Sequence, residues 1–293
     1  MQPQKLVRPE EIKRVIALSD GRQLALSRPL IMGILNVTPD SFSDGGKFAT
    51  TGTAVEQALR MIEEGADIID IGGESSRPGA EPVDAEEEQN RILPVVRQLR
   101  KQGKVPISVD TYKAATAEAA LGEGADIVND ISALRFDPNL AGLVAKSRAP
   151  VILMHMLGSP RTMQENPSYN DCVAEIKEFF EVRIKFATNA GIDKSKIIID
   201  PGIGFGKRLS DNLDILAGLR EFKSFSLPVM IGVSRKRFIG MLHHAGGPAD
   251  RRLGGSISAA VAAVINGADI VRVHDVAETV EALKVVQAIR EKV

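Results

Sequence analysis

Residues 65–71 read Gly-Ala-Asp-Ile-Ile-Asp-Ile, and the same Gly-Ala-Asp triplet recurs at 124–126 and 267–269. Each triplet follows a stretch with apolar residues at helical spacing and precedes a short, almost continuously hydrophobic run. Because glycine is common just beyond a helix C-terminus, each triplet predicts a helix that ends and a buried strand that begins. We assign the triplets no catalytic role.

Eight hydrophobic runs of this kind occur along the chain, each bounded by Gly, Pro or Asp. Their nearly continuous hydrophobicity is typical of strands that are covered on both faces in a parallel sheet. The predicted strands are 31–35, 67–71, 107–110, 126–129, 151–154, 197–200, 229–233 and 269–273. The predicted helices between them include 53–65, 86–102, 114–124, 171–191 and 256–267.

Eight strands that alternate with helices predict an α/β fold, a single (β/α)8 TIM barrel, which usually spans about 250 residues. Residues 15–26, with Asp20-Gly21 as a turn signal, predict a short N-terminal hairpin (about 13–27) that closes the barrel bottom. An open, doubly wound sheet is the alternative, but its G-x-G-x-x-G fingerprint does not follow the first strand. We expect one domain over 1–293, with the barrel at about 30–291.

The composition excludes several classes of protein. The 37 Lys and Arg residues against 38 Asp and Glu give a net charge of −1, which argues against nucleic-acid binding by bulk electrostatics. No apolar run reaches the roughly 20 residues of a membrane span, so we expect no membrane partner. The single cysteine, Cys172, fits a reducing compartment. Residues 1–10 lack the features of a secretory signal, and we therefore expect a cytoplasmic protein.

In such a barrel the active site is built at the C-terminal ends of the strands. Polar residues stand at every one of these ends, which predicts a concave, polar ligand site. They are Asn36, 74–77 (Glu-Ser-Ser-Arg), Asp110, Asn129, Asp130, His155, Asp200, 234–237 (Ser-Arg-Lys-Arg), Arg272 and His274.

Several of these residues also have a purely structural explanation. Asp110 and Asp130 are equally suited to cap the helices that follow them. Residues 200–202 (Asp-Pro-Gly) fit a turn, and 235–237 fit a solvated run of charge. His155 stands between two methionines, so we expect it to be packed rather than catalytic.

Three of the residues suit a flat heterocycle. Asp110, Asn129 and Asp200 offer acceptors and an amide for the edge of a pterin or a purine. The segment 202–207 (Gly-Ile-Gly-Phe-Gly-Lys) does not have the glycine spacing of a P-loop. We interpret it as a loop that brings backbone and Phe205 close to such a ligand.

Cationic residues suit phosphate or a ring carbonyl. Lys236, Arg272 and His274 are the candidates, and barrels often bind phosphate after their last two strands. A helix N-terminus preceded by glycines is also expected there, at 254–256. Two loops rich in Gly, Ser and Asp, 38–48 and 74–82, suggest lids that close over a substrate.

The chain lacks H-E-x-x-H, C-x-x-C and G-x-S-x-G motifs, so we expect no tightly held transition metal. A Mg²⁺ ion that is bound jointly with substrate phosphates needs only one or two protein oxygens. Asn36 is the candidate ligand for such an ion.

Eight segments together resemble the signature motifs of the dihydropteroate synthase family, in the family's order and over about residues 31–275. The longest are 32–46 (Met-Gly-Ile-Leu-Asn-Val-Thr-Pro-Asp-Ser-Phe-Ser-Asp-Gly-Gly) and 71–80 (Ile-Gly-Gly-Glu-Ser-Ser-Arg-Pro-Gly-Ala). The others are 108–111, 128–131, 154–156, 200–207, 234–236 and 272–275.

The resemblance implies a transferase of folate biosynthesis. It would join 6-hydroxymethyl-7,8-dihydropterin pyrophosphate to 4-aminobenzoate, release pyrophosphate and form 7,8-dihydropteroate, with Mg²⁺ as cofactor. The family also implies competition by sulfonamides and, together with the apolar faces of 256–267 and 280–289, a homodimer.

Site residues carry over by position. The resemblance implies that the pterin ring is held by Asp110, Asn129, Asp200 and Lys236, and the pyrophosphate by Arg272, His274 and Asn36, which also contacts Mg²⁺. The 4-aminobenzoate pocket would be shaped by Ser76, Arg77, Pro78, Phe205 and Lys236. The expected catalytic residues are Asp110, Asp200, Lys236, Arg272 and His274.

The implied chemistry is an SN1-like displacement. Neutralised pyrophosphate would leave first, Asp110 and Asp200 would stabilise the positive charge on the pterin methylene, and the neutral arylamine would then attack. Two positions depart from the common family pattern. Ser76 replaces a frequent Thr and keeps its hydroxyl, whereas Arg237 replaces a frequent Ser and leaves open how the aminobenzoate carboxylate is bound.

Two alternatives remain at this point. A pterin-binding methyltransferase on the same barrel would share the pterin-holding residues but would need no pyrophosphate site. A catalytically inert pterin-binding paralogue would be expected to lose some of the motifs. The intact motif 36–46 with Arg272 and His274 argues against both.

Overall fold

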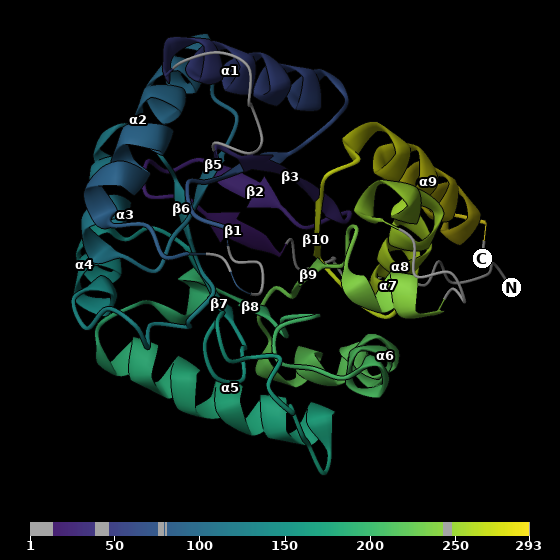
Figure 1. Cartoon of the computed structure of the whole chain (residues 1–293). Coiled ribbons are helices and arrows are strands. Elements are labelled where there is room, and N and C mark those ends of the chain that lie inside the picture. Colours follow the sequence, from purple (N-terminus) through teal and green to yellow (C-terminus); the bar gives the residue numbers. More distant parts are fainter. Residues whose placement is uncertain (1–13, 39–46, 76–78, 80, 243–247, 293) are drawn as a thin grey trace, which may run out of the picture.

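A computed structural model describes residues 14–38, 47–75, 79, 81–242 and 248–292. The barrel strands are β3 (Leu30–Asn36), β4 (Ile68–Gly72), β5 (Ile107–Asp110), β6 (Ile127–Asp130), β7 (Val151–Met154), β8 (Ile197–Asp200), β9 (Met230–Gly232) and β10 (Ile270–Val273). Within the described residues they form one parallel sheet in the order β8-β7-β6-β5-β4-β3-β10-β9. A parallel bridge between Ile199 and Val229 joins the two edges, so the sheet closes into a barrel (Figure 1).

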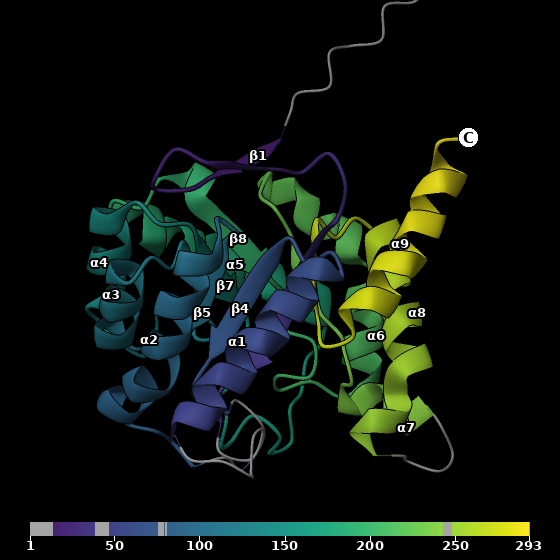
Figure 2. The ribbon, with the colours of Figure 1, turned by 90° about the horizontal axis from the view of Figure 1, so that it is seen from above.

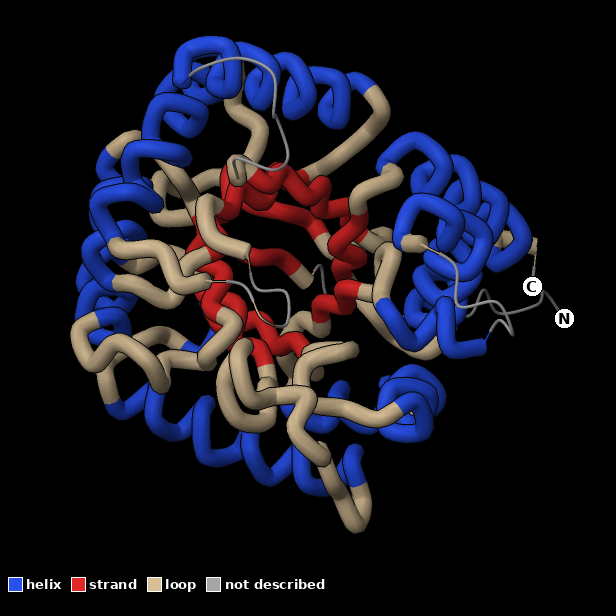
Figure 3. The backbone as a smooth tube through the Cα atoms, viewed as in Figure 1, coloured by secondary structure: helices blue, strands red, loops and turns tan. Residues whose placement is uncertain are grey.

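Helices connect the strands and surround the ring of strands on its outside (Figure 3). They are α1 (Lys47–Glu63), α2 (Ala85–Gln102), α3 (Ala114–Gly122), α4 (Leu140–Ser147), α5 (Cys172–Asn189), α6 (Leu209–Ala217), α7 (Arg237–Leu242), α8 (Leu253–Ile265) and α9 (Val276–Arg290). Aspartates begin two of them: Asp84 accepts the N–H of Glu87 at 2.8 Å, and Asp171 that of Ala174 at 3.0 Å. Each bond satisfies an N–H that has no partner inside its helix.

Side chains of a strand alternate between its two faces, and this alternation divides the barrel interior into layers. The lower inward-facing layer is apolar and consists of Leu30, Met32, Ile68, Ile127, Ile152, Ile198, Met230 and Ile270. Two residues further along four of these strands stand Asp70, Asn129, Asp200 and Arg272. A polar layer therefore lies directly on an apolar plug, toward the C-terminal ends of the strands.

An antiparallel hairpin, β1 (Val15–Ala17) and β2 (Gln23–Ala25), lies across the other end of the barrel (Figure 2). Ile16 and Leu18 are buried against the apolar layer. The predicted hairpin at the barrel bottom is thus confirmed.

The Gly-Ala-Asp triplets make one repeated contact at this end. Their glycines adopt the left-handed region, with φ of 106° at Gly65, 103° at Gly124 and 106° at Gly267. The aspartate of each triplet then bonds one residue of a neighbouring strand twice: its N–H donates to that residue's carbonyl, and its carboxylate accepts that residue's N–H. The pairs are Asp67–Ile31, Asp126–Ile107 and Asp269–Val229. The triplets therefore fix strand register.

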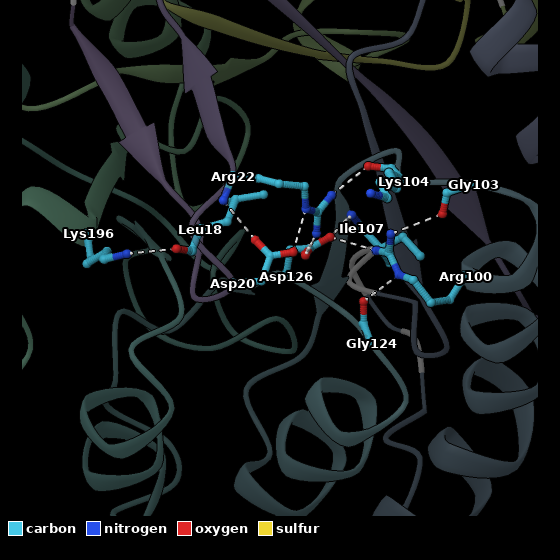
Figure 4. A network of polar contacts seen from close by, with 10 residues as sticks. All are labelled: Leu18, Asp20, Arg22, Arg100, Gly103, Lys104, Ile107, Gly124, Asp126 and Lys196. Carbon is cyan, nitrogen blue, oxygen red and sulfur yellow. Dashed lines mark hydrogen bonds and ion pairs between the residues drawn. The ribbon is translucent and has the colours of Figure 1, made fainter.

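Arginines attach the hairpin to these aspartates. Asp126 pairs with Arg22 of the hairpin and with Arg100 of α2, the latter at 2.7 Å (Figure 4). Arg22 also donates to Asp20 and to the carbonyl of Lys104, each at 2.5 Å. This network stabilises the closed bottom of the barrel.

The predicted barrel is confirmed, and the open-sheet alternative is wrong because the edge strands meet. Every predicted strand lies within one residue of the observed bounds, whereas α1 begins six residues before its predicted start at 53. Helices α4, α6 and α7 were not predicted; none has more than nine residues, so their periodic pattern is weak. No helix in the described part of the chain has the length and apolarity of a membrane span.

Candidate active site

A pocket lies at the C-terminal ends of the strands, above the apolar plug. It is a concave site that opens to solvent. Its walls are formed by Asp110, Asn129, Ile131, Met154, Asp200, Gly202, Ile203, Phe205, Met230, Gly232, Lys236 and Arg272. The structure thus brings together six of the predicted site residues, whose individual roles stay predictions.

Arg272 bridges two carboxylates in this pocket. Its Nε donates to Oδ2 of Asp70 at 2.5 Å, and its Nη2 donates to Oδ2 of Asp110 at 2.7 Å. The same Asp70 oxygen accepts Nδ2 of Asn129 at 3.0 Å. Burial acts to lower the pKa of Arg272, but Asp70 and Asp110 outweigh it and raise the pKa, so the guanidinium stays charged.

Two pocket carboxylates are poised to accept a proton or a hydrogen bond. Burial raises the pKa of Asp110 to about 7, opposed by Arg272 and assisted by Asp70. Burial also raises the pKa of Asp200, opposed by the N–H of Gly202, which donates to Oδ1 at 2.8 Å, and by Lys236. Carboxylates of this kind suit a donor-rich ring or a developing positive charge.

Glycines shape the loop after β8. Gly202, Gly204 and Gly206 have φ of 70°, 81° and 66°. A Cβ on Gly202 would lie 2.0 Å from the carbonyl oxygen of His155, so no other residue fits there. The loop places Ile203 and Phe205 in the pocket wall, and their contact with a flat ligand stays a prediction.

The ammonium of Lys236 lies 4.1 Å from the centroid of the Phe205 ring. Burial lowers the pKa of Lys236 to about 8, opposed by Asp200. Its chain neighbour Arg235 has a φ of 57° and is held by an ion pair with Asp275 at 2.5 Å and by Oγ of Ser256, which accepts its N–H at 2.8 Å. Lys236 therefore lines the pocket from a backbone that its neighbour Arg235 holds in place.

His155 is packed, as expected. Its ring contacts Phe179 edge-on at 4.8 Å between centroids, and its Nδ1 lies 2.9 Å from Nζ of Lys207. Burial lowers the pKa of His155 well below its usual range and that of Lys207 to about 7. Lys207 also donates to the carbonyl of Phe205 at 3.0 Å, and this hydrogen bond stabilises the glycine-rich loop.

His274 follows β10 and lies near the pocket without lining it. Ser234 Oγ accepts the N–H of His274 at 3.2 Å and lies 3.0 Å from its Nδ1. A hydrogen bond therefore joins the Ser234 hydroxyl and Nδ1 of His274. Burial, with Arg272 and Arg235, lowers the pKa of His274 to about 3. We expected a cation here, but in the free protein the imidazole of His274 is neutral.

Asn36 ends β3 and is half-buried, level with Gly72 and, one strand further, Asp110. Among the described residues, no group of three or more His, Cys, Asp or Glu side chains could hold a metal ion. One carboxamide oxygen fits an ion that takes most of its ligands from phosphate and water, which is the usual state of Mg²⁺.

Ser76, Arg77, Pro78 and most of the first predicted lid lie outside the described residues. Glu74, just before them, is held by two residues that follow β5: Tyr112 Oη donates to it at 3.0 Å, and Lys113 forms an ion pair with it. Lys113 also pairs with the buried Glu88 of α2 at 3.1 Å. A polar network thus fixes the start of the second predicted lid.

Two candidates belong to the framework rather than the pocket. Asp130 accepts the N–H groups of Ser132 at 2.7 Å and Leu134 at 2.5 Å, and so shapes a turn; it neither caps a helix nor lines the pocket. The expected glycine-preceded helix N-terminus at 254–256 is wrong, because α8 begins at Leu253. A Cβ on Gly255 would lie 2.2 Å from Cγ2 of Ile239, so this glycine allows α8 to pack on α7.

Asp70 is the main site residue that we did not predict. It lies within a hydrophobic strand rather than at its end, where we looked for polar residues. The alternation of side chains along the strand could have indicated that Asp70 faces the barrel interior. Asp70 stands two residues after the inward-facing Ile68, as Asn129 does after Ile127. Among the apolar wall residues, Ile131 and Met154 stand in the motifs 128–131 and 154–156, whereas Met230 carries no signal beyond its hydrophobicity.

Known proteins match this chain over most of its length. A family model described as pterin binding enzyme matches residues 32–274. The dihydropteroate synthase of Escherichia coli (strain K12) is 50% identical over 270 residues, which are 92% of this chain and 95% of that protein. This chain belongs to the dihydropteroate synthases of the pterin-binding enzyme family.

Solved structures of dihydropteroate synthases show the same barrel. The Xanthomonas albilineans dihydropteroate synthase with 4-aminobenzoic acid is 48% identical and superposes with a TM-score of 0.89, covering 95% of this chain and 98% of that chain. The same synthase in complex with 7,8-dihydropteroate is 47% identical, with a TM-score of 0.84 and coverages of 93% and 97%. The predicted family is confirmed.

Proposed function

We propose that this chain joins 6-hydroxymethyl-7,8-dihydropterin pyrophosphate to 4-aminobenzoate, with release of pyrophosphate and formation of 7,8-dihydropteroate. The observation that carries the proposal is one pocket that unites two carboxylates, an amide and two cations in a dihydropteroate synthase barrel: Asp110, Asp200, Asn129, Lys236 and Arg272.

The pterin ring fits the deep part of the pocket. Asp110 and Asp200 accept hydrogen bonds from its ring and amino N–H groups. The side-chain amide of Asn129, whose Nδ2 donates to Asp70, forms hydrogen bonds with the edge of the ring. Lys236 donates to a ring carbonyl. The apolar walls Met154 and Ile131 exclude water from the ring faces.

The pyrophosphate fits the rim next to β10. Arg272 supplies charge, and the imidazole of His274 supplies a hydrogen bond. We propose that Asn36 holds a Mg²⁺ ion together with the pyrophosphate oxygens. When bound, this ion neutralises the charge of the leaving group.

The displacement is SN1-like. As the C–O bond to pyrophosphate breaks, positive charge develops on the pterin methylene and spreads into the ring. Asp110 and Asp200 stabilise this charge in a buried pocket, where electrostatic interactions are strong. The amine of 4-aminobenzoate then bonds to the methylene and gives an arylammonium. Because an arylammonium is acidic, it releases its proton to water, and no strong general base is needed.

The amine substrate enters beside the Phe205 ring. We propose that Phe205 and Lys236 border its pocket together with Ser76, Arg77 and Pro78 of the second lid. Arg237 begins α7, next to Lys236, and its exposed side chain is available to the aminobenzoate carboxylate.

Pyrophosphate release tests the function. Purified protein is incubated with the dihydropterin pyrophosphate and Mg²⁺, with and without 4-aminobenzoate, and the pterin product is identified by mass. Release that requires the amine and yields dihydropteroate supports the proposal. Tight pterin binding without release would instead indicate a pterin-binding methyltransferase or an inert paralogue.

We also propose that the protein is a cytoplasmic homodimer. Exposed apolar side chains on α8 and α9 support a dimer face; they include Ile265, Val285 and Ile289. The lone, buried Cys172 fits a reducing compartment. Light scattering of the purified protein and of a Val285→Asp variant tests the oligomer: the variant should have half the mass.

A further inference from the structure

Asp70 occupies the centre of the polar layer. It lies in the middle of β4, between Ile34 of β3 and Ser108 of β5, and its side chain is fully buried. Its Oδ2 accepts both Nε of Arg272 and Nδ2 of Asn129. One oxygen therefore fixes two side chains that line the pocket, although Asp70 does not itself line it.

Stability alone does not account for this carboxylate. Oδ1 of Asp70 has no hydrogen-bond partner in the described residues, nor has Oγ of Ser108, which stands beside it in the register. Buried polar atoms without partners destabilise a fold, and a buried ion pair is often no more stable than apolar residues of similar size. The preceding inward-facing residue of β4 is Ile68, so an apolar side chain can fill an inward position of this strand.

Two carboxylates, those of Asp70 and Asp110, hold Arg272 in the free protein, and only that of Asp110 is accessible from the pocket. Asp110 lines the pocket, so the carboxylate that accepts Nη2 of Arg272 is also one that a pterin can reach. Asp70 lies beneath the pocket, out of reach of the substrate. Once Asp110 has turned to the ring, Asp70 is the anchor that keeps the guanidinium oriented.

We propose that Asp70 is a positioning residue of this reaction: it holds Arg272 and Asn129 in place while Asp110 exchanges Arg272 for the substrate. The kinetic test of this role rests on the proposed function. Its structural basis is the pair of hydrogen bonds that Asp70 accepts. Asp70 thus contributes to binding of the dihydropterin pyrophosphate and not to binding of 4-aminobenzoate.

Asp70→Asn is the test, because the amide oxygen still accepts from both partners while the charge is lost. We expect KM for the dihydropterin pyrophosphate to rise at least about tenfold, kcat to fall, and KM for 4-aminobenzoate to stay within about twofold. Asp70→Ala, which removes the acceptor as well, should have the larger effect.

Asp67→Asn is the matched control. Asp67 precedes the same strand, pairs with Arg28 at 2.6 Å, and lies at the opposite end of the barrel. This variant should lower the melting temperature and leave both KM values unchanged. For Asp70→Asn we expect the reverse, with a melting temperature no lower than that of the wild type.

The pH profile separates positioning from a general loss of structure. The groups that act on Asp110 are Arg272, which lowers its pKa, and Asp70, Glu88 and Asp130, which raise it. Without the Asp70 charge, the acid limb of kcat/KM should move to lower pH, which a loosened fold would not cause. Wild-type KM values and an unmoved limb in Asp70→Asn would overturn the proposal.

Calorimetric binding of the dihydropterin pyrophosphate distinguishes this inference from the proposed function. If the wild type binds it but forms no dihydropteroate, the proposed function fails, and weaker binding by Asp70→Asn still supports the positioning role. If both proteins bind equally, the positioning role fails whatever the activity.

Discussion

Nζ of Lys236 lies 4.1 Å from the centroid of the Phe205 ring, so a cation with a lowered pKa rests on a flat apolar surface inside the pocket. The contact joins the loop after β8 to the loop after β9. Because cation–π contacts contribute about 0.5–2 kcal/mol, each residue fixes the other.

We therefore expect Phe205→Leu to raise KM for 4-aminobenzoate by about two- to thirtyfold, the range that corresponds to loss of this contact. Leucine keeps an apolar wall but lacks the aromatic face. Steady-state kinetics with each substrate varied in turn measures the effect. Phe205→Tyr, which keeps the ring, should remain close to the wild type; an equal effect of both variants would contradict the role of the ring.

The pH dependence should be bell-shaped. Asp110 must be ionised to stabilise positive charge, and its pKa of about 7 gives an acid limb along which kcat/KM rises. Lys236 must be protonated, and its pKa of about 8 gives a basic limb along which kcat/KM falls. The maximum for the dihydropterin pyrophosphate should lie between these values. Lys236→Arg should remove the basic limb, since arginine stays charged; a limb that persists near pH 8 would refute this assignment.

Asp130 and Asp110 end neighbouring strands but should respond in opposite ways. Asp130→Ala leaves the N–H groups of Ser132 and Leu134 without their acceptor and should cost about 2 kcal/mol or more of unfolding free energy. Its activity per folded molecule should persist. Asp110→Asn should lower kcat/KM at least about a hundredfold with little loss of stability, because a buried charge is removed. Urea unfolding and kinetics on both proteins check the contrast.

Lys207 should make stability depend on pH. Its pKa is about 7 in the folded protein and has its ordinary value of 10.5 in the unfolded chain. Between these values the unfolded chain binds more protons, so this lysine's contribution to stability rises with pH. From pH 7 to 9 the wild type should gain more than about 1 kcal/mol relative to Lys207→Met, measured by urea unfolding. A constant difference between the two proteins would show that Lys207 does not titrate in this range.

The sequence by itself determined the strands and the end of the barrel that holds the site. Residues 197–200, for example, form an apolar run that ends in a carboxylate, and such a pattern depends only on local composition. Family motifs along the chain gave the chemistry as well, because the residues that contact a ligand stand at fixed positions after each strand.

Only the tertiary structure decided which polar residues act together. Asp130 and Asp110 follow the same local pattern, yet one shapes a turn and the other faces Arg272. Asp70 belongs to the site because it accepts a hydrogen bond from Arg272, which is 202 residues away in the chain. His274 is neutral because it is buried near Arg272. Strand register, burial and the neighbouring charges all depend on residues distant in sequence, and they set both the pKa values and the partners of every group in the pocket.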